Sequence, residues 1–260
     1  MSKNEDCIDF ENCPIMGHQG GRMTGIIESG LLLMSSAERR IETLANNVAN
    51  VTTPGFKRQI SFADVLGVRA AATFGAPGEL LSRRTDFGQG RLSETGNPLD
   101  IAISGDGFFR LRDGDRAVFT RDGQFRRADD GTIVTQQGQV LQQADGGDLV
   151  LEGSDVEILR DGTVLSAGSP VGRIALAMPA HGSAAEAIGG SLFRIPEEAI
   201  EEVASPDLRQ RHVEASNVAL GDEMAAMTVA LRQAESGARL VTLYDELLGR
   251  AITAFGQAGR

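Results

Sequence analysis

The sequence predicts an α+β fold, with long N- and C-terminal helices that pair as a coiled coil and a central antiparallel β-rich domain. Apolar residues recur at heptad spacing near both ends of the chain, and between them the pattern changes to alternation broken by Asp-Gly turns. We expect a polar N-terminal extension (1–22), an N-terminal helix and turn (23–58), a connecting arm (59–98), a β-rich domain with its return segment (99–210) and a C-terminal helix (211–260).

The N-terminal helix is predicted from apolar residues at alternating steps of three and four, which is the a/d seam of a coiled coil. The seam consists of Ile27, Gly30, Met34, Ala37, Ile41, Leu44, Val48 and Val51. Proline disfavours a helical conformation in the residue before it, and glycine permits a tight turn. The turn out of the helix is therefore expected at Thr53, Pro54, Gly55 and Phe56.

Three asparagines, Asn46, Asn47 and Asn50, lie in the last part of this helical pattern, although asparagine is a poor helix former. Asn46 and Asn50 are four residues apart and therefore share a helix face. Amides suit a crowded contact in which polar groups bond to another chain without burying charge. A local alternative, in which asparagine helps to stop the helix, explains Asn50 well and Asn46 poorly.

The C-terminal helix is predicted from the same rhythm, with Asp245 as an interruption. Its seam consists of Leu220, Met224, Met227, Leu231, Ala234, Ala238, Val241, Leu248, Ile252 and Phe255. The returning helix should start with Ser216, Asn217, Val218 and Met224. Because glycine and alanine bury little surface, the helix pair is expected to be marginal and to fold fully only among copies or partners.

The middle of the chain, residues 101–168, alternates apolar and polar residues between Asp-Gly pairs, as expected for antiparallel hairpins. The stretches DGTIV (130–134) and DGTVL (161–165) echo one another, and each fits a turn that leads into a strand.

Composition and motifs favour a protein without catalytic chemistry. The net charge of −11 argues against a nucleic-acid partner or an anionic membrane. We find no phosphate-binding loop, no metalloprotease motif and no nucleophile elbow, and Asp113-Gly-Asp115 lacks the spacing of a calcium loop. Cys7 and Cys13 fit no zinc spacing. No catalytic residue, metal site or cofactor is therefore predicted.

The first 22 residues lack the apolar core of a secretory signal, and nothing in the chain approaches the roughly 20 apolar residues of a membrane span. We therefore expect a chain that is either cytoplasmic or exported by a route that leaves no cleaved signal.

Four stretches resemble the flagellar rod and hook proteins, the axial proteins of the bacterial flagellum, and they occur in that family's order. They are LANNVANVTTPGFKR (44–58), TGNPLDIAISGDGFFRL (95–111), FTRDGQFRRADDGTIVTQQGQVL (119–141) and VEASNVALGDEMAAMTVALRQAE (213–235). The chain departs from the family pattern at Ala234, where a tyrosine is usual, and at Gly237, where an asparagine is usual.

The resemblance implies a helical polymer that crosses the periplasm, with paired terminal helices forming the inner tube and a β domain forming the outer layer. It also implies export through the flagellar type III apparatus without a cleaved signal, and partners that are copies of the chain and other rod and hook-family subunits. A short chain with a single β region resembles the proximal rod protein most, and the distal rod protein is the alternative.

We therefore predict a structural subunit of the flagellar basal-body rod, polymerising through its terminal helices to transmit torque. Inter-subunit packing is assigned to Leu44, Asn46, Asn47, Val48 and Asn50. Alternatives from other classes are a carbohydrate-binding module or enzyme on a β scaffold with a helical dimer zipper, and an adhesin-like surface protein.

Overall fold

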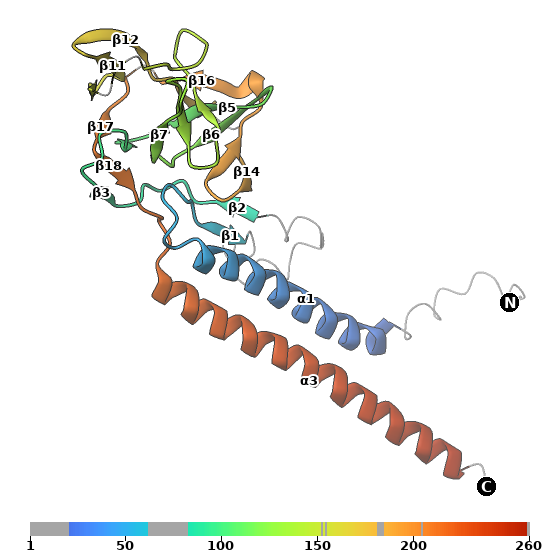
Figure 1. Cartoon of the computed structure of the whole chain (residues 1–260). Coiled ribbons are helices and arrows are strands. Elements are labelled where there is room, and N and C mark those ends of the chain that lie inside the picture. The colour runs from blue at the N-terminus through green and yellow to red at the C-terminus, as the bar shows by residue number, and fades with distance from the viewer. Residues whose placement is uncertain are drawn as a thin grey trace, which may run out of the picture. The chain divides into compact units, whose positions relative to one another are not determined.

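The computed structural model describes residues 21–61, 83–151, 153, 155–180, 185–203 and 205–258 (Figure 1). The predicted extension 1–22 lies almost wholly outside the described residues, as do Cys7, Cys13 and part of the predicted connecting arm. The described chain contains two long α-helices and a β-rich centre, which confirms the α+β class. The boundaries of the five predicted segments remain predictions.

The chain divides into two compact units. We call the unit formed by Met1–Ile41 with Thr228–Arg260 the helical unit, and the unit formed by Glu42–Met227 the β unit. Helix α1 (Gly21–Ala49) and helix α3 (Leu220–Ala258) each have residues in both units. Neither described helix combines the length and apolar character needed to cross a lipid bilayer.

In the helical unit, α1 and α3 approach closely where both carry glycine. A Cβ atom on Gly237 would lie 2.7 Å from the Met34 Cγ and 3.1 Å from the Gly30 carbonyl oxygen. A Cβ atom on Gly30 would lie 3.3 Å from Val241 Cγ2. Gly237, where the sequence departs from the family pattern, therefore permits this approach of the two backbones.

Three residues of the predicted α1 seam are buried, and so are Thr43 and Asn47, which lie outside the seam. Gly30, Ala37 and Leu44 are buried, whereas Leu31 and Leu32 are more than half exposed. The structure does not describe the side chain of Ile27, which is also a predicted seam residue.

Helix α3 differs from its prediction. Its fully buried positions are Glu223, Ala230 and Gly237, which are spaced by seven residues. The predicted seam residues Met224 and Leu231 are 58% and 49% exposed. At Gly237 the reason is steric, because a larger side chain would meet Met34 and the Gly30 backbone. At Glu223 the reason is polar, because the buried carboxylate pairs with Asn47 and Arg58. The most apolar face of α3 is thus not the face buried in this chain.

The β unit is built from antiparallel ladders in the part of the chain that the structure describes. Its largest sheet contains strands β5 to β9 and β13 to β16, in the order β14-β15-β6-β5-β9-β8-β7 with β13 bridging β5 and β16. The bounds are β5 Phe108–Asp113, β6 Arg116–Thr120, β7 Phe125–Arg127, β8 Ile133–Thr135, β9 Val140–Leu141, β13 Leu176–Pro179, β14 Glu186–Gly189, β15 Leu192–Arg194 and β16 Ile200–Glu202, the last preceded by the 3-10 helix η2, Glu197–Ala199.

Smaller sheets complete this unit. One has the order β10-β11-β12, and three pairs, β1-β2, β17-β4 and β18-β3, join segments far apart in sequence. The bounds are β1 Gln59–Ser61, β2 Arg83–Thr85, β3 Leu92–Glu94, β4 Ile101–Ile103, β10 Val156–Ile158, β11 Thr163–Ser166, β12 Ser169–Arg173, β17 Leu208–Gln210 and β18 His212–Glu214. Strand β17 pairs with β4, and β18 pairs with β3. The segment that leaves the β region therefore lies beside the segment through which the chain entered it.

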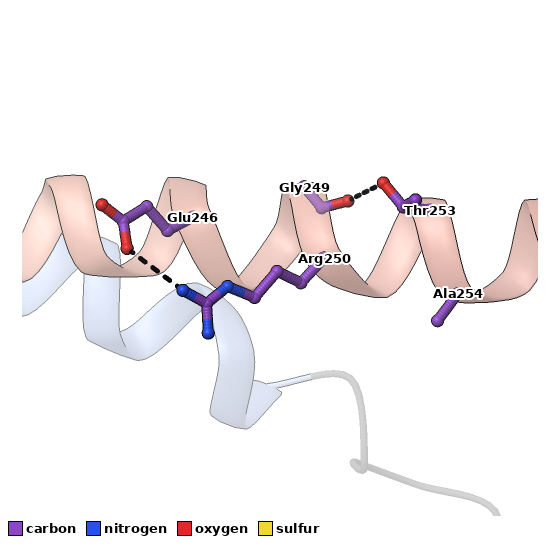
Figure 2. Close-up of a pocket in the computed structure, with 5 residues that line it drawn as sticks. All are labelled: Glu246, Gly249, Arg250, Thr253 and Ala254. Carbon is purple, nitrogen blue, oxygen red and sulfur yellow. Dashed lines mark hydrogen bonds and ion pairs between the residues drawn. The ribbon is translucent and has the colours of Figure 1, made fainter.

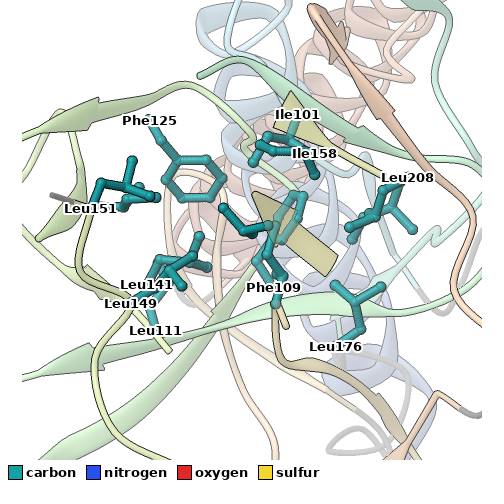
Figure 3. Packing of buried hydrophobic residues seen from close by; sticks show 14 of the residues in the cluster. Ile101, Phe109, Leu111, Phe125, Leu141, Leu149, Leu151, Ile158, Leu176 and Leu208 are labelled. Atoms are coloured by element: carbon teal, nitrogen blue, oxygen red, sulfur yellow. The ribbon is translucent and has the colours of Figure 1, made fainter. Parts of the chain in front are cut away.

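The core of the β unit consists of aliphatic and phenylalanine side chains from many strands (Figure 3). Phe109 and Phe125 meet edge to face at 5.2 Å between ring centroids, a favourable geometry for aromatic rings. A second cluster forms around Phe108, Phe119 and Phe193.

The repeated Asp-Gly-Thr turns have the predicted form. The Asp130 carboxylate accepts hydrogen bonds from the Thr132 backbone N–H and hydroxyl, and Asp161 does the same with Thr163. These bonds lower the pKa of both aspartates, because they stabilise the charged carboxylate.

Candidate interaction site at the helix ends

The residues that join the ends of α1 and α3 to the β strands form one polar cluster within the second unit. We call it the junction, and it consists of residues 47–59, 86–90, 121–123 and 214–223.

Directly after the end of α1, the Asn50 side chain forms local hydrogen bonds. The Asn50 side chain donates a hydrogen bond of 2.9 Å to the Asn46 carbonyl oxygen, and the Thr53 hydroxyl donates one to Asn50 Oδ1. The Asn46 carbonyl oxygen also accepts the Asn50 backbone N–H at 3.2 Å, so the side-chain bond adds to an existing helical bond. These local bonds agree with the local explanation for Asn50, which stays a prediction.

Gly55 allows the turn to lie directly against the β unit. Its φ of +68° favours glycine, and a Cβ atom there would overlap the backbone of Arg121 and Asp122. The Gly55 N–H donates a hydrogen bond of 2.8 Å to the Glu214 carbonyl oxygen. The predicted turn residues thus bring the chain leaving α1 into contact with the chain that returns to α3.

Asn47 is fully buried, and its amide is fully used within the chain. Its Oδ1 accepts from the Gln59 N–H at 2.9 Å, and its Nδ2 donates to the Gln59 carbonyl oxygen at 2.8 Å. The same Nδ2 donates to Glu223 Oε2 at 3.0 Å, and Arg58 Nε donates to the other oxygen of that carboxylate. Asn47 therefore connects α1, strand β1 and the first turn of α3.

Glu214 is the centre of a second buried set. Lys57 Nζ lies 2.6 Å from Glu214 Oε1, and Arg121 Nη1 lies 3.2 Å from Glu214 Oε2. The Gly90 N–H also donates to Glu214, while the Lys57 ammonium donates to the Gly88 carbonyl oxygen at 2.9 Å. A single carboxylate thus holds two cations and one backbone amide out of water.

Burial dominates the electrostatics of these cations. It lowers the pKa of Lys57 and of Arg121, because a charged group loses its hydration, and the ion pair with Glu214 partly offsets this effect. Removing one partner of such a pair leaves an uncompensated buried charge, which is far more costly than losing an exposed pair.

Asn217 completes the junction. Its Oδ1 accepts from the Arg58 N–H at 2.7 Å, and its Nδ2 donates to the carbonyl oxygens of Asp86 and Gly88. The predicted starting residues Ser216, Asn217 and Val218 lie just before the helix, which begins at Leu220. Ser216 accepts a hydrogen bond from the Val218 N–H.

The residues predicted to form inter-subunit contacts are thus in different environments. Asn46 is exposed, Val48 and Asn50 are half-buried, and Leu44 and Asn47 are buried within this chain. Their role in contacts between subunits remains a prediction.

Sequence reasoning did not single out the charged members of the junction. Those that form ion pairs are Lys57, Arg58, Arg121, Glu214 and Glu223. One signal was available, because Lys3 and Lys57 are the only lysines in a chain with 25 basic residues. A rare residue type directly after a turn suggests a specific partner.

The described residues also form a shallow groove on α3, lined by Glu246, Gly249, Arg250, Thr253 and Ala254 (Figure 2). Figure 2 shows that these residues all lie on one helix, and each is exposed. The described residues contain no cluster of three or more His, Cys, Asp or Glu side chains able to hold a metal ion. This groove therefore provides no enclosed site for a ligand.

Comparison with known proteins matches three parts of the chain to flagellar families. Residues 34–57 match the flagella basal body rod protein family, 102–166 the D1 domain of the flagellar hook protein FlgE/F/G, and 209–254 the C-terminal region of the flagellar basal body rod FlgEFG protein.

Individual relatives extend the match over most of the chain. The basal-body rod protein FlgF of Salmonella typhimurium is 32% identical over 230 residues, covering 80% of this chain and 88% of the relative. FlgG of Caulobacter vibrioides is 32% identical over 246 residues, covering 83% and 93%. FlgG of Bacillus subtilis is 29% identical over 260 residues, covering 85% and 95%.

Two long helices, a β-rich centre and the three family matches together define a structural protein of the flagellar axial class. The chain belongs to the family of flagellar basal-body rod proteins. It is a structural rod protein and not an enzyme, so the predicted resemblance is confirmed and the enzyme alternative is not supported.

Proposed function

We propose that this chain is a rod subunit of the proximal type, which polymerises helically through α1 and α3 and transmits torque. The observation that carries the proposal is the apolar surface of α3, because a long helix that leaves large apolar side chains in water is typical of an interface. The proposed partners are copies of the chain and other rod and hook-family subunits.

The pairing of α1 and α3 as a coiled coil is part of this proposal. It is supported by the close approach at Gly30 and Gly237 and by the seven-residue spacing of buried Glu223, Ala230 and Gly237. Such a pair would present the remaining face of α3 to neighbouring subunits.

That remaining face carries large apolar side chains at helical spacing. Leu240, Leu243 and Leu247 recur at steps of three and four, and all are at least 41% exposed. Ile252 and Phe255 are 71% and 80% exposed. Helix α3 has 39 residues and is therefore about 58 Å long, which suits repeated contacts with several neighbours.

Helical polymerisation requires a contact between two different surfaces that repeats without closing into a ring. We assign Asn46, Val48 and Asn50 to such contacts directly. Leu44 and Asn47 would act indirectly, by holding the end of α1 in place.

We further propose that the chain lies in the periplasmic part of the basal body and leaves the cell through the flagellar type III apparatus without a cleaved signal. Membership of the flagellar basal-body rod family supports this route. The proximal position rests on the short chain with a single β region, and the distal position is the alternative.

The test is complementation of a deletion strain. We expect the unmodified chain to restore motility and Ile252→Asp to abolish it, because a charge on the apolar face would be buried unpaired in the polymer. The matched control is Ile188→Asp, which adds the same charge at a half-exposed isoleucine of the β region and should leave motility intact. Normal motility with Ile252→Asp would contradict assembly through this face.

Position along the rod is tested separately, by electron cryo-microscopy of purified basal bodies. Density for this chain next to the base of the rod is expected. Density only at the end that joins the hook would replace the proximal assignment by the distal one.

A further inference from the structure

The compact unit that holds the β strands also holds the ends of both helices. Its span, Glu42–Met227, includes the last two turns of α1 and the first two turns of α3. The helix ends thus belong to the β unit by their contacts, although the rest of each helix belongs to the other unit.

Forming the first turn is the unfavourable step for any helix. Nucleation reduces the probability of a helix by on the order of a thousandfold, whereas extension of an existing turn is close to neutral or favourable per residue. A folded unit that already contains one turn of a helix therefore removes most of the barrier to the remaining turns.

We propose that the junction is a built-in nucleus for both helices: it orders the end of α1 and the start of α3 in the unassembled subunit, and each helix propagates from it toward its chain terminus. The inference rests on the proposed function only in that assembly would complete the propagation.

The contacts at the nucleus come from both helices and from the β region. The buried Asn47 side chain of α1 bonds to the β1 backbone at Gln59 and to Glu223 in the first turn of α3. Glu223, also fully buried, binds Arg58 at the edge of the same strand. If either helix end unfolds, buried polar side chains of the other helix end become exposed or lose their hydrogen-bond partners. The formation of the two helix ends is therefore coupled.

The polar chemistry makes the nucleus specific in geometry. A buried amide or carboxylate without its partners is costly, so a shifted helix register would leave Asn47 and Glu223 unsatisfied. An apolar contact would tolerate such a shift more easily. The negative charge of Glu223 also lies at the N-terminal end of α3, where the helix dipole favours it.

Burial declines along α3 away from the junction. Glu223, Ala230 and Gly237 are buried in turn, but every described side chain from Asp245 to Phe255 is exposed. Local stability follows the density of buried contacts, so helical order should fall in the same direction.

Hydrogen exchange on the full-length monomer tests the proposal. We expect amide protection in α3 to be greatest at 220–230 and to fall toward 258, and protection in α1 to be greatest at 42–49 and to fall toward 21. Uniform protection along the helices, or protection that rises toward the chain termini, would overturn the proposal.

Substitution at the nucleus tests the coupling. Asn47→Ala should lower protection at least tenfold at the start of α3, and Glu223→Ala should do the same at the end of α1, while amides of β5 and β6 change less than twofold. The control Glu246→Ala removes an exposed ion pair with Arg250 far along α3 and should leave 220–230 unchanged. An effect confined to the substituted helix would refute a shared nucleus.

Should either alanine variant also lose protection in β5 and β6, Glu223→Gln provides the milder test, because it keeps the shape and removes the charge. A loss in both helix ends with Glu223→Gln supports the nucleus, and no loss in either overturns it. The hydrogen-exchange test and the motility test can fail separately. The exchange pattern is measured on the monomer, so it does not depend on whether Ile252→Asp restores motility.

Discussion

The junction and the outer half of α3 are opposite in their surface chemistry. In the junction, charged side chains are buried and joined to one another, as with Lys57 and Glu214 at 2.6 Å. From Asp245 to Phe255, apolar side chains such as Ile252 and Phe255 are exposed. One region pairs most of its charged groups within the chain, and the other leaves its apolar groups for contacts outside it. The difference separates what folds the subunit from what assembles it.

The largest effect should come from Glu214→Ala, which leaves two buried cations without their anion. We expect a loss of about 3–5 kcal/mol in the free energy of unfolding, measured by urea denaturation of the monomer. The matched control is Glu186→Ala, which removes the partner of Arg194 in an exposed pair and should change stability by less than about 1 kcal/mol. Similar losses in both variants would show that burial does not distinguish the junction.

Gly55→Ala should have the next largest effect. The substitution combines a left-handed backbone with overlap against Arg121 and Asp122, and we expect a loss of at least about 2 kcal/mol by thermal or urea unfolding. Gly96→Ala is the control, because Gly96 also has a positive φ but open space at the Cβ position. Its loss should be only about 1 kcal/mol. Equal losses would mean that the close approach contributes nothing.

Asp122→Asn should stabilise the protein at neutral pH. Burial raises the pKa of Asp122 to about 6, so the folded state favours the neutral carboxyl group. The stability that this preference contributes is present below the ordinary value of 3.8 and is lost as the pH rises through about 6.

We therefore expect Asp122→Asn to gain about 1–3 kcal/mol at pH 7, because asparagine carries no charge to bury. The gain should disappear below pH 4, where the aspartate is neutral too. Unfolding curves at several pH values measure it. A gain in stability that is the same at pH 4 and pH 7 would contradict this explanation, in which burial penalises the charged carboxylate of Asp122.

The smallest effect on the monomer should come from Ile252→Ser on the outer half of α3. An exposed side chain contributes little to folding, so the free energy of unfolding should change by less than about 0.5 kcal/mol. A loss above 1 kcal/mol would mean that this face is covered within the monomer and would remove the contrast with the junction.

Local patterns predicted the elements but not all of the faces they bury. The seam of α1 was correct at Gly30, Ala37 and Leu44, which are buried. The prediction for α3 was only partly correct, since the predicted seam residues Met224 and Leu231 are exposed. An apolar residue is a good guide to burial only where the neighbouring helix leaves room for its side chain. At Gly237 the neighbouring backbone is too close, so the buried face consists of small residues and one carboxylate.

The site was predicted in part. Asn47, Gly55 and Asn217 were identified from the sequence, but their partners were not. Lys57 and Glu214 are 157 residues apart, and Asn47 and Glu223 are 176 residues apart. No periodicity or turn signal carries information over that distance.

The sequence by itself determined the two terminal helices, the antiparallel β centre, the turn at Pro54-Gly55 and the family resemblance, because spacing and turn chemistry act between near neighbours. The tertiary structure decided which face of α3 is covered and which charges meet in the junction. These depend on how closely two backbones can approach and on which polar groups must share a dry interior, and both are properties of segments brought together only by folding.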